Sequence, residues 1–171
     1  MKKKFYAAAL ALSVSLASHT AFAATDADDF VEDASAKGVA EVEAGKLAQE
    51  KGTAADVKAF GAMMVKDHTA ANEKLKAIAE RKKLEVSTDA ELLDKAKAMI
   101  LDLRSAKSFD QAYANNQVKA HEATIDIFED EINNGDDAEL KAFATETLPK
   151  LKAHLDQAKS LAKAHGGDAG Q

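Results

Sequence analysis

Apolar residues recur at every third or fourth position along most of the chain, which is the spacing of an amphipathic α-helix. No stretch has the alternation of apolar and polar residues that is typical of a half-buried strand. Glycines and capping residues interrupt the pattern, with Thr53 expected to cap the second helix and Gly52 and Gly135 to end helices. The pattern predicts helices over residues 28–51, 54–83, 90–103, 109–134 and 137–165.

Four of these predicted helices are long, and the one over residues 90–103 is short. Long helices joined by short connections favour an up-down four-helix bundle, with the short helix acting only as a connector. We therefore expect an all-α protein with one domain over residues 24–165. The glycine-rich residues 166–171 are expected to be a disordered tail.

The first 23 residues have the pattern of a secretory signal peptide. Three lysines are followed by an apolar run over residues 5–16 and by the small-x-small sequence Ala21-Phe22-Ala23. Cleavage is expected before Ala24. No second long apolar run follows, so we expect an exported, soluble protein without stable membrane insertion.

The net charge disfavours two classes of binding partner, and the absence of cysteine excludes disulfides. The signal segment holds three lysines and no acidic residue, so its removal changes the net charge from −6 to −9. This charge disfavours binding to nucleic acid or to an anionic membrane surface. The chain has no cysteine, so no disulfide can stabilise it and the core must do so.

Each long helix carries one ionisable residue within its otherwise apolar or small-residue stripe. These residues are Glu41, His68, His121 and His154, and antiparallel packing would bring them to a similar height. Imidazole nitrogens and a carboxylate are ligands for zinc, copper and iron. The pattern predicts one transition-metal ion bound by these four residues.

Other polar residues and a thioether lie near this height and are candidates to orient the imidazoles from outside the ligand set. His165, at the end of the last helix, is expected to be an exposed cation instead. A metal-free alternative stays open, because buried histidine and glutamate can also form a hydrogen-bonded network. The candidates for the outer set are Met64, Asp67, Asp110, Tyr113 and Glu129.

Common catalytic motifs are absent from the sequence. It has no cysteine, no glycine-rich phosphate loop, no G-x-S-x-G elbow and no H-E-x-x-H. Two functions remain. One is metal binding for metal handling or defence against oxidative stress, and the other is a metal-free envelope interaction or stress protein whose core Glu/His network is structural.

Four segments, "EVEAGKLA", "FGAMMVKDHTAANEKL", "FDQAYANNQVKAHEATIDIFEDE" and "LPKLKAHLDQA", together resemble domain-of-unknown-function family 4142. The resemblance implies an exported ferritin-like four-helix bundle in the periplasm or envelope of a Gram-negative bacterium and implies no established reaction. Di-iron bundles carry Glu-x-x-His on two helices, but Val65, Val118 and Leu151 stand three residues before the core histidines. A mononuclear site is therefore expected.

Overall fold

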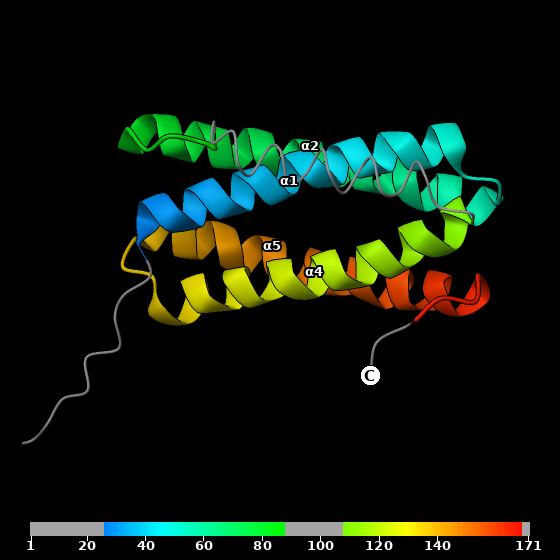
Figure 1. The fold of residues 1–171 in the computed structure, drawn as a ribbon. Helices are drawn as coiled ribbons and strands as arrows, with labels where there is room; N and C mark the ends of the chain where they lie inside the picture. The colour runs from blue at the N-terminus through cyan, green and yellow to red at the C-terminus, as the bar shows by residue number, and fades with distance from the viewer. Residues whose placement is uncertain (1–25, 88–107, 169–171) are drawn as a thin grey trace, which may run out of the picture.

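The computed structural model describes residues 26–87 and 108–168, which form a bundle of four long helices (Figure 1). The pair α1 and α2 packs against the pair α4 and α5. The prediction of an all-α four-helix bundle is confirmed. The predicted short helix over residues 90–103 lies outside the described residues. The helices are α1 (Ala27–Lys51), α2 (Ala55–Lys82), α4 (Phe109–Asn134) and α5 (Ala138–Ala164).

The helix directions differ in one respect from strict alternation, because α2 and α4 run in the same direction. Asp110, at the start of α4, accepts a hydrogen bond from Thr53, just before α2. At the other end of the bundle, Lys82 of α2 pairs with Asp137, before α5, at 2.6 Å. The end of α2 and the start of α4 thus lie at opposite ends, as in bundles with one long crossover connection.

Asp110 of α4 caps α2. This corrects two expectations from the sequence, that Thr53 caps α2 and that Asp110 orients an imidazole. Thr53 is not the cap: α2 follows Ala54, which makes no side-chain capping bond. The Asp110 carboxylate instead accepts from the amides of Thr53 and Ala54, both at 2.9 Å. Burial alone would raise the pKa of Asp110, but these hydrogen bonds outweigh it and the pKa is lowered. Asp110 therefore joins α4 to the start of α2 and orients no imidazole.

The helices α1 and α2 approach closely where two glycines face each other. A Cβ atom at Gly45 would lie 2.7 Å from the Gly61 carbonyl oxygen, and a Cβ at Gly61 would lie 2.7 Å from the Gly45 carbonyl oxygen. Any side chain here would push the helices apart. The two glycines therefore allow α1 and α2 to pack closely at this point.

The core consists of two apolar clusters. The first surrounds Met64, Val118 and Ala158, and the second surrounds Phe30, Phe128 and Leu151. Phe30 makes an edge contact with Phe128 at 5.3 Å between ring centroids. In the sequence of each long helix, a buried ionisable residue stands between the positions that join the first cluster and those that join the second.

Two further expectations concern the ends of the chain and membranes. Residues 166–168, expected to be disordered, contact α4: the Gln111 amide donates to the Gly166 carbonyl, and the Asp168 amide donates to Asn115 at 2.7 Å. Backbone groups at a helix end need partners, and α4 supplies them.

Within residues 26–87 and 108–168, no helix has the length and apolar character needed to cross a membrane.

Glu131, near the end of α4, is a buried carboxylate outside the polar level of the core. Its side chain is 1% exposed, and neither carboxylate oxygen has a hydrogen-bond partner among the described residues. Burial, with a smaller effect of the nearby Asp137 carboxylate, raises the pKa of Glu131 from 4.5 to about 7. The folded protein therefore holds this proton more tightly than the unfolded chain does.

Glu131 makes the free energy of unfolding depend on pH in a defined direction. Its stabilising contribution is complete below pH 4.5 and is lost as the pH rises through 7. We expect Glu131→Gln, which stays neutral, to be more stable than wild type at pH 8 by about 1–3 kcal/mol and similar to it at pH 5. Urea unfolding at both pH values measures the difference.

The control is Glu129→Gln, because Glu129 is half-exposed and pairs with Lys152 at the surface. Such a surface pair contributes about 0–1 kcal/mol. A gap between wild type and Glu131→Gln that is the same at pH 5 and pH 8 would contradict the assignment.

Candidate metal centre

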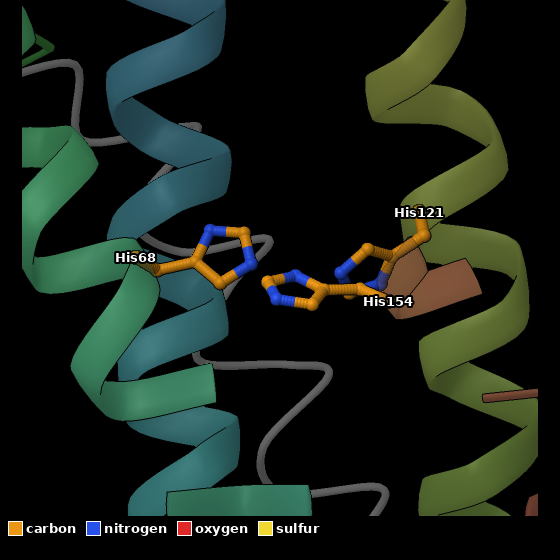
Figure 2. Close-up of side chains that lie close together, drawn as sticks. All are labelled: His68, His121 and His154. Carbon is orange, nitrogen blue, oxygen red and sulfur yellow. The ribbon is translucent and has the colours of Figure 1, made fainter. Parts of the chain in front are cut away.

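Three histidines from three helices meet in the middle of the bundle (Figure 2). His68 comes from α2, His121 from α4 and His154 from α5. Their ring centroids form a nearly equilateral triangle with sides of 5.5, 5.5 and 5.6 Å. One nitrogen of each ring lies within 4.8 Å of the other two. Three of the four histidines that follow residue 23 are thus in one place.

All three imidazoles are buried, with 6%, 1% and 2% exposure for His68, His121 and His154. Burial, reinforced by the neighbouring imidazoles, lowers the pKa of His68 from 6.5 to about 3. Burial also lowers the pKa of His154, against the opposing effect of Asp67. Both rings are therefore neutral at pH 7, the form in which a histidine binds a metal.

Hydrogen bonds fix which nitrogen of His121 and His154 carries the proton. His121 Nδ1 lies 2.9 Å from the backbone carbonyl oxygen of Gln117. A carbonyl only accepts, so Nδ1 donates and Nε2 keeps its lone pair. His154 Nε2 faces the Asp67 carboxylate at 3.1 Å, so this nitrogen donates and Nδ1 keeps its lone pair.

The remaining nitrogen of each ring has no hydrogen-bond partner among the described residues. These atoms are His121 Nε2, His154 Nδ1 and also His68 Nε2. An unpaired buried polar atom costs about 1–3 kcal/mol, so three in one place need an explanation. Tetrahedral Zn–N bonds of about 2.0–2.1 Å put nitrogens about 3.3 Å apart, which side-chain shifts of about 1 Å can reach.

Glu41, the fourth predicted ligand, is buried on α1 but is not part of the three-histidine group. Its carboxylate accepts a hydrogen bond of 2.8 Å from the side chain of Gln117. Burial raises the pKa of Glu41, while His121 and the Gln117 bond act in the opposite direction. Gln117 thus links Glu41 to His121, since its amide holds the first and its backbone carbonyl holds the second.

Among the residues expected to orient the imidazoles, only Asp67 makes a hydrogen bond to one of them in the described part of the chain. Besides His154, the Asp67 carboxylate contacts Lys150 at 3.4 Å. Burial alone would raise the pKa of Asp67, but the bond from His154 and the charge of Lys150 outweigh it and the pKa is lowered. An ionised carboxylate on the outer nitrogen of a histidine is the usual support of a metal ligand.

The other four candidates for the outer set contact residues other than the three histidines. Met64 is fully buried in the first apolar cluster, and Glu129 pairs with Lys152 at the surface. Tyr113 stacks on Phe109 with ring centroids 5.8 Å apart, and burial raises its pKa well above 10. Asp110 caps α2, as described above.

Two further positions depart from sequence expectation. His165 is less exposed than expected, at 19% for its side chain, and its Nε2 lies 3.1 Å from the Asp56 carboxylate, whose pKa is lowered chiefly by this bond. Gln117 was missed. The available signal was its position four residues before His121 on the same helix face, where a glutamine can reach a neighbouring helix while its carbonyl meets the imidazole.

Comparison with known proteins identifies the family to which the chain belongs. The family model described as "Domain of unknown function (DUF4142)" matches residues 12–161. The chain belongs to the DUF4142 family. This match includes Glu41 and all three core histidines of this DUF4142 protein. No curated protein and no solved structure gives a significant match, so the functional argument rests on the site itself.

Proposed function

We propose that this DUF4142 protein binds one transition-metal ion through His68, His121 and His154. The observation that carries the proposal is the group of three buried histidines, in which one nitrogen of each ring lies within 4.8 Å of the other two. Each ring also has a nitrogen without a hydrogen-bond partner among the described residues. Three neutral imidazoles suit zinc, copper and ferrous iron better than magnesium or calcium, which prefer oxygen ligands.

Two carboxylates are placed to balance the charge of a buried dication without binding it. Asp67 acts through His154 and is 19% exposed at its side chain. Glu41 acts from α1, held by Gln117. A negative charge near a buried cation offsets part of its desolvation cost. This arrangement replaces the four-ligand site expected from sequence with three imidazole ligands and two outer anions.

The role we propose is metal handling in the cell envelope, after export and cleavage before Ala24. A metal-free network is the competing explanation, but its rings would satisfy one another by hydrogen bonds. Each of the three rings instead keeps one nitrogen without a hydrogen-bond partner among the described residues. The buried position of the rings favours retention of one ion over turnover of a large substrate.

Metal titration of the purified protein tests the proposal. Wild type, isolated from the periplasm with the intact mass of a chain beginning at Ala24, is expected to bind one zinc or copper ion per chain. His68→Leu should lose this binding, because one of the three nitrogens is removed. A metal concentration of about 100 times the dissociation constant should stabilise wild type by about 2.7 kcal/mol and leave His68→Leu unchanged.

The control for this titration is His165→Ala, whose histidine lies outside the group and contacts Asp56. It should bind metal as wild type does. Without metal, His68→Leu should be no less stable than wild type, because an unpaired polar group is replaced by an apolar one. Absence of stoichiometric binding by wild type, together with loss of stability in metal-free His68→Leu, would favour the structural network.

Asp67 provides a second test, because it touches the metal only through His154. Asp67→Asn keeps the size of the side chain but weakens the acceptor that holds His154 in its ligand tautomer. We expect the metal dissociation constant to rise by about 10–100-fold with unchanged stoichiometry. Isothermal titration calorimetry measures both quantities.

The matched control is Asp156→Asn, on the exposed face of the same helix as His154. It should leave the dissociation constant within about twofold of wild type, since surface charges are strongly screened. Equal effects of the two substitutions would show that Asp67 acts only by long-range charge.

A further inference from the structure

A small cavity lies on one side of the three-histidine group. Its volume is about 20 Å³, and His68 itself forms part of its wall. About 10–15 Å³ is enough for one water molecule. The cavity therefore has room for at least one water molecule, or for the coordinating end of a small anion, beside the imidazole of His68.

All four helices contribute to this cavity, mostly with residues that lie one or two turns from the polar level. On α4 the wall includes Thr124, three residues after His121, and on α5 it includes Thr147, seven residues before His154. At 1.5 Å per residue these positions lie about 4.5 and 10 Å along the helix axes. The cavity is thus in the layer next to the three imidazoles, on the side of the second apolar cluster.

On the side away from the cavity, buried side chains fill the space next to the three-histidine group. Met64, four residues before His68, is fully buried there. Gln117, four residues before His121, is also fully buried and is held by Glu41 at 2.8 Å. A ligand that is not part of the protein can therefore reach the three nitrogens more easily from the side of the cavity.

The protein supplies three ligands, whereas zinc and related ions take at least four. Among the described residues no other histidine, aspartate or glutamate joins the group. Building on the proposed metal site, we propose that the ion has a fourth coordination position that faces this cavity and takes one exchangeable ligand, a water molecule or a small anion.

Charge favours an anion at this position. The carboxylates of Asp67 and Glu41 do not bind the ion, so no protein ligand in its coordination shell is an anion, and Lys37 of α1 lies in the cavity wall. Asn72 of α2 lines the same wall against Gly38, where a Cβ atom would collide with the Asn72 amide oxygen. Lys37 and Asn72 are polar and partly exposed, so a small ion can enter the cavity past these two side chains.

Azide binding to the cobalt(II)-loaded protein tests the proposal, because the visible absorption of cobalt(II) reports its ligands. In wild type we expect a saturable spectral change with one azide per cobalt and no loss of metal. Ala34→Val places two additional carbons in the cavity wall and should weaken azide binding about tenfold. Its cobalt stoichiometry should stay that of wild type.

The matched control is Ala36→Val, because Ala36 lies on the same helix and is as buried as Ala34, at 7% against 6% exposure, but does not line the cavity. It should bind azide as wild type does. If Ala34→Val does not fold, Ala71→Leu fills the same cavity from α2.

The possible failures are distinguishable. Stoichiometric cobalt binding with a spectrum that azide does not change would overturn the open position and leave the metal site standing. Equal weakening by Ala34→Val and Ala36→Val would also overturn it, since the effect would not depend on the cavity. Failure of wild type to bind cobalt at all would overturn the proposed function and this inference with it.

Discussion

The burial of three imidazoles at the centre of a helical bundle is the constraint on which the rest of the structure depends. Each ring of His68, His121 and His154 keeps one nitrogen without a hydrogen-bond partner in the described part of the chain. An apolar core would be more stable with leucine at these positions, because unpaired polar atoms gain nothing from burial. Several surrounding residues make contacts that hold these imidazole rings in place.

Support for the rings comes from three different kinds of contact. The backbone carbonyl of Gln117 fixes the tautomer of His121, and the carboxylate of Asp67 fixes that of His154. Gly45 and Gly61 allow close packing of α1, which carries Glu41, on α2, which carries His68. Contacts within the protein thus orient His121 and His154, and side-chain shifts of about 1 Å would bring the three nitrogens to metal-ligand distances.

The helical period of the apolar residues explains which features of the fold and of the candidate site could be predicted from the sequence. The stripe of apolar residues that His68, His121 and His154 interrupt has the helical period, so their burial follows from the pattern alone. Contacts that depend on how helices are placed against each other do not follow from it. The Asp110 cap, the parallel directions of α2 and α4, and the bond between Gln117 and Glu41 are of this kind. For the same reason sequence could place Glu41 on the correct face but could not show that its carboxylate has a partner other than the histidines.

X-ray absorption spectroscopy of the zinc-loaded protein tests the central claim most directly, because imidazole rings give a characteristic multiple-scattering signal. The account predicts about three imidazole nitrogens at about 2.0–2.1 Å and one further light atom that is not a histidine. A spectrum with one imidazole or none, dominated by carboxylate oxygens, would mean that zinc binds elsewhere and would contradict a metal site at His68, His121 and His154.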